Sequence, residues 1–291
     1  MIRLGVVGHL GYQGLPDVLA TLRRLAPALG LRLAYEDTIR SVAGPRAEAI
    51  VPGEQDAMLT LGGDGTMLRA ARIVGEHPVP ILGINLGRLG FLTCAPGDGL
   101  ETALRRYAAG DYHVEPRMAL HARVLDLQGV ARAEWRALND VVLHKGGFAR
   151  VVTVAVKANG ETVAHYSADG IVLATPTGST AYNLSAGGPV VFPTLETILL
   201  TPVSAHTLAL RALVLPPTSE ITLRVEDGPE ELLVTVDGQV GATFAKGETL
   251  VVRRSAHPVQ VVRFPESSFF ATMRQKLQWG GLLDRDEPQR C

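Results

Sequence analysis

Residues 57–68 read Ala-Met-Leu-Thr-Leu-Gly-Gly-Asp-Gly-Thr-Met-Leu, and this stretch decides how the first part of the chain folds. Its first five residues are mostly apolar, which is typical of a buried strand. The glycines that follow permit positive φ angles and remove the Cβ atoms that would keep a ligand away from the backbone. The stretch therefore predicts a strand, an open turn, and a helix N-terminus that favours phosphate.

Short apolar segments and helical segments alternate on both sides of this stretch. We expect further strands at residues 2–8, 31–35 and 79–84, with the third strand at 57–61. A helical stripe begins at Leu15, and Pro27 is expected to end or bend that helix. Strands that alternate with helices predict a mostly parallel sheet with helices on its faces.

The pattern changes from about residue 117. Residues 151–156 form a β-branched run, and Asn159-Gly160 then supplies a type I′ hairpin turn. Further strands are expected at 221–225, 233–236, 250–253 and 259–262, which together predict a largely antiparallel β domain. Phe269, Phe270, Met273 and Leu277 share one face of a final helix, which we expect to pack on the first domain.

The predicted organisation is therefore an α/β domain at residues 1–116, joined by the returning segment 265–291, and a β-rich domain at 117–264. The composition supports a globular chain, with 291 residues, 46% hydrophobic and 20% charged. The net charge of −1 gives no basis for nucleic-acid binding, and no apolar run is long enough to span a bilayer. The two cysteines lie far apart and no signal-peptide pattern precedes them, so we expect a cytoplasmic protein.

Asp64 is the one acid within the first glycine turn. An acid and a phosphate repel each other, so an acid beside a phosphate cradle needs either a metal ion between them or a hydroxyl to activate. Both are tasks of a kinase site. The alternative is an ordinary strand–turn–helix corner in which Asp64 caps the helix. A Rossmann fingerprint is absent because Leu68 replaces its third glycine, and no P-loop pattern occurs.

A second loop, residues 175–189, reads Thr-Pro-Thr-Gly-Ser-Thr-Ala-Tyr-Asn-Leu-Ser-Ala-Gly-Gly-Pro and follows Asp169-Gly170. Its hydroxyls and backbone amides can bond to a ribose or to phosphate oxygens, and Tyr182 offers a face for stacking. A Ser/Thr-rich connecting loop is the alternative. A serine hydrolase is disfavoured because Asn183 replaces the first glycine of the nucleophile elbow. Asn139-Asp140 and the segment 237–239 are, by themselves, turn residues.

Together these stretches resemble the bacterial NAD kinase family, which phosphorylates NAD to NADP. The matching segments are 62–68, 82–92, 138–140, 169–189, 237–239 and 276–280, so the resemblance extends along most of the chain. The first motif is shared with diacylglycerol-type lipid kinases, whereas the segment from Thr175 to Tyr182 is far more specific. The resemblance implies a Rossmann-like α/β domain, an all-β sandwich-like C-terminal domain, and a C-terminal helix that returns to the first domain.

The resemblance also implies roles for individual residues. Asp64 is the expected proton acceptor for the 2′-hydroxyl of the adenosine ribose. Asn139 and Asp140 are expected on the ribose and adenine side of NAD, and Asp169 at its nicotinamide end. The remaining expected substrate-binding residues are Gly63, Gly65, Thr66, Arg69, Asn85, Phe91, Arg150, Thr177, Thr180, Ala181, Tyr182, Asn183, Leu184, Ser185 and Gln239. The family more often has Asn-Glu where this chain has Asn139-Asp140.

The implied partners are NAD and a phosphoryl donor, either ATP or polyphosphate, with Mg²⁺ or another divalent cation brought with the ATP. The sequence leaves NAD and NADH open as acceptors. It also leaves the role of His9 open, because relatives often carry basic residues in that loop. A homodimer or homotetramer is expected. Two other functions stay open at this point, namely a lipid kinase with the same glycine loop and a catalytically silent dinucleotide-binding sensor.

Overall fold

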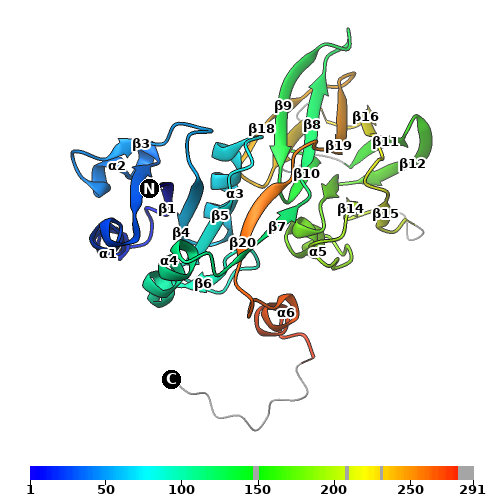
Figure 1. Cartoon of the computed structure of the whole chain (residues 1–291). Coiled ribbons are helices and arrows are strands. Elements are labelled where there is room, and N and C mark those ends of the chain that lie inside the picture. Colours follow the sequence, from blue (N-terminus) through cyan, green and yellow to red (C-terminus); the bar gives the residue numbers. More distant parts are fainter. Residues whose placement is uncertain (147–150, 207–209, 230–231, 281–291) are drawn as a thin grey trace. The chain divides into compact units, whose positions relative to one another are not determined.

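A computed structural model describes residues 1–146, 151–206, 210–229 and 232–280 (Figure 1). The chain divides into two compact units. Unit 1 comprises residues 1–74, 79–115 and the segment from 260 onward, and unit 2 comprises residues 75–78 and 116–259.

Unit 1 is built on a sheet with the strand order β3-β2-β1-β4-β5-β20-β7, in which β6 also pairs with β5. The strands are β1 (Ile2–Gly8), β2 (Leu31–Tyr35), β3 (Glu48–Ala49), β4 (Ala57–Leu61), β5 (Ile81–Asn85), β6 (Ala95–Pro96), β7 (His113–Arg117) and β20 (Val259–Arg263). The pairs from β3 through β20 are parallel. All five residues of β4 and of β5 are buried, as expected of strands covered on both faces.

The helices of unit 1 are α1 (Leu15–Leu25), α2 (Asp37–Ala43), α3 (Asp64–Val74), α4 (Leu100–Ala108) and α6 (Phe269–Leu277). Helix α1 buries leucines at the helical spacing 15, 19, 22 and 25. It ends at Leu25, and a 3₁₀ turn begins at Pro27. The expected early end is therefore confirmed, because a proline inside the helix would clash with the preceding turn.

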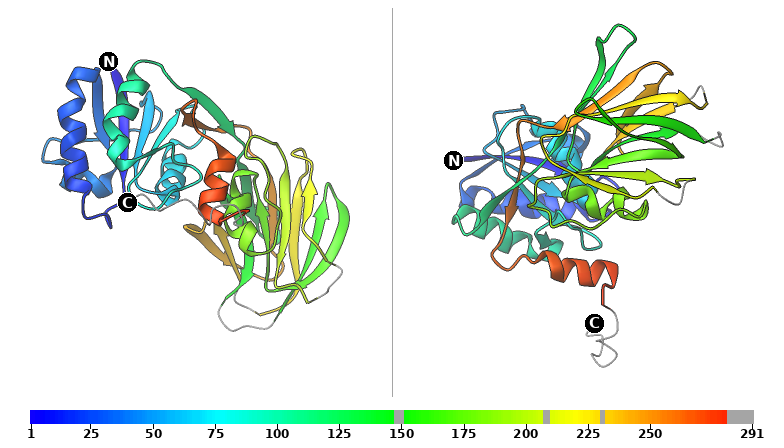
Figure 2. Two further views of the ribbon diagram at one scale, coloured as in Figure 1. Left: turned by 90° about the horizontal axis from the view of Figure 1, so that it is seen from below. Right: turned by 90° about the vertical axis from the view of Figure 1, so that its right-hand side faces the viewer.

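One predicted strand lies in a different sheet from the one expected. The sequence predicts the segment 259–262 among the antiparallel strands, but β20 pairs in parallel with β5, with Val261 beside Ile81. Four of the five residues of β20 are buried. Burial on both faces fits a parallel sheet covered by helices, and a run of apolar residues alone does not distinguish the two settings. The chain then enters α6, which Figure 2 shows in orange-red near the end of the trace.

Unit 2 contains two six-stranded sheets, with the orders β15-β14-β13-β10-β17-β18 and β12-β11-β16-β19-β8-β9. Its strands are β8 (Leu120–Leu125), β9 (Ala131–Ala137), β10 (Asp140–Lys145), β11 (Val152–Ala158), β12 (Glu161–Ala168), β13 (Gly170–Ala174), β14 (Ile198–Val203), β15 (Leu213–Leu215), β16 (Ile221–Asp227), β17 (Leu232–Val236), β18 (Val240–Phe244) and β19 (Thr249–Arg254); the short helix α5 spans Tyr182–Ser185. Neighbouring strands are antiparallel. Asn159 and Gly160 have φ angles of 51° and 84°, which confirms the type I′ turn between β11 and β12.

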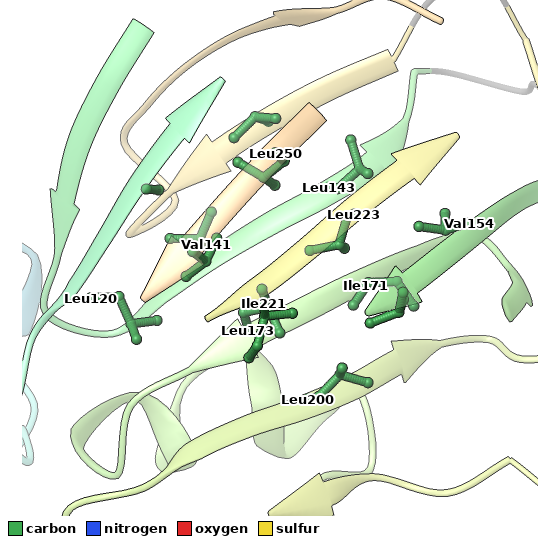
Figure 3. Close-up of a cluster of buried hydrophobic side chains, with 14 of the residues drawn as sticks. Leu120, Val141, Leu143, Val154, Ile171, Leu173, Leu200, Ile221, Leu223 and Leu250 are labelled. Carbon is green, nitrogen blue, oxygen red and sulfur yellow. The ribbon is translucent and has the colours of Figure 1, made fainter. Parts of the chain in front are cut away.

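The core of unit 2 lies between these two sheets, so the β domain is a sandwich. Figure 3 shows Leu143, Leu173 and Leu200 of one sheet facing Leu120, Leu223 and Leu250 of the other. All six belong to one cluster of buried residues. The alternation of buried and partly exposed residues along β8, β11 and β16 matches the period-two pattern in the sequence. In the part of the chain that the structure describes, no helix is long and apolar enough to cross a membrane.

We predict that Leu223→Ala lowers the free energy of unfolding by about 2–5 kcal/mol, because Leu223 is fully buried between the sheets and its truncation leaves a cavity. Val214→Ala is the matched control. The Val214 side chain lies at the surface in β15, and the expected change is about 0.5 kcal/mol or less. Equilibrium urea unfolding measures both. Equal losses in the two variants would contradict the assignment of Leu223 to the core.

Candidate functional site

The first glycine turn lies where the strand order of the parallel sheet reverses direction. From β1 the chain adds β2 on one side and β4 on the other, so the carboxyl ends of β1 and β4 flank the switch point. Open α/β sheets bind ligands at such a point. Gly62 follows β4 there, and a Cβ atom on it would lie 2.2 Å from the Thr66 hydroxyl oxygen. Only glycine lets the turn close this tightly onto α3.

Asp64 is the first residue of α3, and a distant segment binds its carboxylate. Phe91 N–H donates to Oδ2 at 2.9 Å and Leu92 N–H donates to Oδ1 at 3.0 Å. A Cβ atom on Gly90 would lie 2.1 Å from Oδ1, so the approach of this segment requires glycine at that position. The ammonium of Lys276, in α6, lies 3.4 Å from Oδ2. Backbone donors, a cation and the helix N-terminus all stabilise a negative charge here.

The segment that binds Asp64 is itself fixed from its other side. Arg263, at the end of β20, donates to the carbonyl oxygen of Phe91 at 2.8 Å and to that of Thr93 at 3.2 Å. Its guanidinium is buried, so these bonds replace those it would make with water. The strand that the sequence assigned to the other sheet thus supports the Asp64 site.

Two other predicted residues of unit 1 are engaged within the protein. The Asn85 side chain accepts from Gly87 N–H at 3.0 Å and donates to the Arg88 carbonyl oxygen at 2.6 Å, which shapes the loop after β5. Arg69 pairs with Glu36 at 2.7 Å and donates to the Gly8 carbonyl oxygen at 2.5 Å, which ties α3 to the end of β1. The remaining predicted residues of this unit are placed as follows: Thr66 buried, Gly63 and Phe91 half-buried, and Gly65 exposed.

In unit 2, three predicted segments meet at one end of a sheet. Strand β10 runs antiparallel to β13 and to β17, so its start at Asp140 lies beside the ends of both strands. Asn139-Asp140, the loop from Thr175 and the turn at Asp237 are therefore neighbours. Asp169 precedes β13 and lies at the opposite end of that strand, on the order of 17 Å away along five residues. Its carboxylate pairs with Lys145 at 2.7 Å.

Asp237 organises the Asn139-Asp140 segment through its carboxylate. It accepts backbone N–H groups from Leu138 at 3.1 Å, Asn139 at 2.7 Å and Asp140 at 3.2 Å. A carboxylate that accepts several N–H groups fixes the path of the chain in the same way as an anion bound by a turn. The sequence predicted only a hairpin turn at Asp237, and this function could not be found without the strand pairing.

The second loop packs on the same segment. Thr175 donates its hydroxyl to the Leu138 carbonyl oxygen at 2.6 Å, and Thr175 N–H donates to that of Asn139 at 2.8 Å. A Cβ atom on Gly178 would lie 2.1 Å from the Asn139 carbonyl oxygen, so the contact requires glycine. The buried Arg117 donates to the Thr177 hydroxyl at 3.2 Å.

Within this loop, the predicted residues divide into buried and accessible ones. Asn183 is fully buried, and its amide bonds the carbonyl oxygens of Ser179 and Pro189 and the hydroxyl of Thr201. The side chain of Tyr182 is exposed at the start of α5, so its ring can stack on a heterocycle. Thr180, Ala181 and Leu184 are half-buried, and Ser185 and Gln239 are exposed. Arg150 lies outside the residues that the structure describes.

Burial raises the pKa of the Asp140 carboxyl to about 7, and the neighbouring negative charge of Asp237 adds to the effect. The Asp140 carboxyl group therefore changes its protonation near neutral pH, and in its neutral form it can donate as well as accept a hydrogen bond. No group of three or more His, Cys, Asp or Glu that could hold a metal ion occurs among residues 1–146, 151–206, 210–229 and 232–280.

The chain matches two family models in the expected order along the sequence. Residues 41–112 match the ATP-NAD kinase N-terminal domain, and residues 138–264 match the ATP-NAD kinase C-terminal domain. An NAD kinase of Gemmatimonas aurantiaca is 57% identical over 285 residues, which is 98% of this chain and 99% of that protein. An NAD kinase of Heliobacterium modesticaldum is 45% identical over 225 residues, covering 77% of this chain and 79% of that protein.

Solved structures give the same result for the fold. A yeast NADH kinase, crystallised with NADH, aligns with a TM-score of 0.86 and 23% identity over 99% of this chain and 90% of that chain. An NAD kinase from Archaeoglobus fulgidus, crystallised with ATP, aligns with a TM-score of 0.71 and 26% identity over 95% of this chain and 99% of that chain.

We predict that Asp140→Asn changes how stability depends on pH. The folded-state pKa of about 7 lies above the value of about 3.9 for a free aspartate, so the folded state binds a proton more tightly. The stabilisation from this proton is present below about pH 4 and is lost as the pH rises to about 7. The free energy of unfolding of the Asn variant, minus that of the unaltered chain, should therefore rise between about pH 4 and about pH 7 and stay constant above about pH 7. Urea unfolding at several pH values measures this difference. If the free energies of unfolding of the two proteins changed in parallel with pH, the raised pKa of Asp140 would be contradicted.

Proposed function

This chain belongs to the NAD kinase family, and we propose that it transfers a phosphoryl group from ATP to the 2′-hydroxyl of the adenosine ribose of NAD. The observation that carries this proposal is the Asp64 carboxylate, which the amides of Phe91 and Leu92 hold at the switch point beside the glycine turn. A donor phosphate meets the positive end of a helix dipole at such a turn. A fixed acceptor for a hydroxyl proton then lies next to it.

We assign to Asp64 the role of proton acceptor. A carboxylate is a much weaker base than an alkoxide, so Asp64 does not deprotonate the ribose hydroxyl in advance. It aligns the hydroxyl oxygen for in-line attack and takes the proton late, when the loose transition state of phosphoryl transfer has formed. Positioning of this kind supplies much of the rate enhancement, and a carboxylate bonded to two backbone amides does not have to be ordered during the reaction.

We assign binding of the dinucleotide to the segments that meet at the start of β10. Asn139 and Asp140 contact the ribose and adenine side, and the exposed ring of Tyr182 stacks on the adenine. Asn183 acts from inside the loop, because its amide is fully used in holding residues 179–189 together. The accessible surface of this loop is provided by Thr180, Ala181, Leu184 and Ser185. Asp169, at the far end of β13, belongs to the nicotinamide side.

A divalent cation, expected to be Mg²⁺, enters this site with the ATP phosphates. Magnesium is commonly bound by one or two carboxylates together with substrate phosphates, and the described residues provide no group of three acidic, His or Cys ligands. The residues that the structure describes therefore do not fit a metal ion held by the protein alone. We further propose a cytoplasmic homodimer or homotetramer, for which light scattering on the purified protein gives the mass.

The two other functions differ from this proposal in what they require. A lipid kinase needs an apolar groove for acyl chains, and a silent sensor needs no acid beside the phosphate turn. A coupled assay with NAD, ATP and Mg²⁺, read by an NADP-specific dehydrogenase, tests all three. NADP formation supports the proposal. NAD binding without turnover on ATP or polyphosphate favours the sensor, and phosphorylation of diacylglycerol favours the lipid kinase. Parallel reactions with polyphosphate and with NADH define the donor and the acceptor.

We predict that Asp64→Asn lowers kcat about 100-fold or more, because an amide cannot accept the proton. The fold and the dissociation constant for NAD should change little. Asp17→Asn is the matched control, since Asp17 is an exposed acid in the first turn of α1 and its loss should leave kcat within about twofold. Near-normal turnover in Asp64→Asn would remove Asp64 from the proposed role.

A further inference from the structure

The last helix of the described chain brings a cation to Asp64 from 212 residues away. Lys276 lies in the final turn of α6, and its ammonium is 3.4 Å from Asp64 Oδ2. The same ammonium lies 5.0 Å from the centre of the Phe91 ring. Phe91 is also the residue whose N–H donates to Oδ2. One oxygen of the proposed proton acceptor is thus shared by a backbone amide and by Lys276.

The position of α6 is fixed by packing as well as by this ion pair. Met273 is buried, and the ring of Phe269 lies 6.0 Å from the ring of Phe91. Ser268 caps the helix start by accepting from Ala271 N–H at 3.3 Å. These contacts hold the helix without Lys276, so removal of the Lys276 charge is expected to leave α6 in place.

An ion pair at a surface ordinarily contributes little, because water screens it and two side chains lose freedom. The ion pair of Lys276 differs from an ordinary surface pair because its carboxylate is the proposed proton acceptor. A phosphoryl donor must approach the hydroxyl that Asp64 receives, and the negative charge of Asp64 repels its phosphates. A cation on the carboxylate reduces this repulsion and keeps Oδ2 occupied from one side.

We propose that Lys276 is a positioning residue of the phosphoryl-transfer site, whose ammonium orients the Asp64 carboxylate and offsets its charge against the incoming donor. The inference rests on the proposed function and extends it to the C-terminal helix. It concerns only residues of unit 1, namely the glycine turn, the segment at Phe91 and α6. Lys276 acts through Asp64 rather than on NAD, so its removal should lower kcat and spare NAD binding.

The first test compares Lys276→Met with Arg274→Met. Arg274 is an exposed cation on the same helix and makes no ion pair with any residue in the described ranges. We expect kcat to fall about tenfold or more in Lys276→Met and to stay within about twofold in Arg274→Met, with the KM for NAD and the melting temperature nearly unchanged in both. A kcat within about twofold of normal in Lys276→Met overturns the proposal.

The second test asks whether the effect passes through Asp64. In an Asp64→Asn background there is no carboxylate for Lys276 to orient, so adding Lys276→Met should cost about twofold or less. The full tenfold cost in that background would show that Lys276 acts independently of Asp64, which overturns the proposal as stated. Arg274→Met is combined with Asp64→Asn as the control, and the effects of these two substitutions on kcat are expected to be independent.

The third test restores the charge chemically. Lys276→Cys is treated with 2-bromoethylamine, which returns an ammonium at nearly the length of lysine, or with iodoacetamide, which does not. Recovery of kcat with the first reagent alone supports the proposal, and equal activity after both overturns it. The unaltered chain, treated in parallel, accounts for reaction at its own cysteines. Burial raises the pKa of the Cys94 thiol to about 11, so that residue reacts slowly.

Failure of the inference can be told apart from failure of the proposed function. If the unaltered chain forms no NADP with any donor, the proposed function is wrong and the role of Lys276 in phosphoryl transfer is overturned with it. If the unaltered chain is active and Lys276→Met is equally active, the function stands and the role of Lys276 is wrong.

Discussion

The hydrogen bonds from Phe91 and Leu92 to the Asp64 carboxylate are the contact on which the candidate site depends. They exist only because Gly90 has no side chain, since a Cβ atom there would overlap Oδ1. The contact joins the turn after β4 to the segment after β5, and Arg263 fixes that segment from the opposite side. An acid with this many fixed partners is already in place before a substrate arrives, which is what a site that works by positioning requires.

In the β sandwich, too, a carboxylate accepts backbone N–H groups from a segment that is distant in the sequence. Asp237 accepts three backbone N–H groups from residues 138–140, and Gly178 allows the second loop to approach the carbonyl oxygen of Asn139. In both units a carboxylate binds the backbone of a distant segment, and a glycine gives the room for it. The accessible groups of the second loop include Tyr182, and the fully buried Asn183 holds the loop that carries them.

Much of this arrangement could be predicted from local patterns. The strand at 57–61, the end of helix α1 before Pro27, the type I′ turn at Asn159-Gly160 and the final helix all follow from residue type and spacing. The sheet to which residues 259–263 belong did not, because apolar residues are equally suited to a parallel sheet and to a sandwich core. The roles of Gly90, Asp237 and Arg263 were also out of reach, since each acts on a residue far away in the sequence.

The sequence by itself determined the alternation of strands and helices in the first part, the β-rich second part, the two glycine-bearing loops and the family, because these depend on residues that are neighbours along the chain. Only the tertiary structure decided which groups meet. Asp64 and Lys276 are 212 residues apart, and they lie side by side because the chain returns through β20 and α6 to the sheet where it began. The pKa of Asp140 is likewise a property of the fold, since burial beside Asp237, and not residue type, raises it.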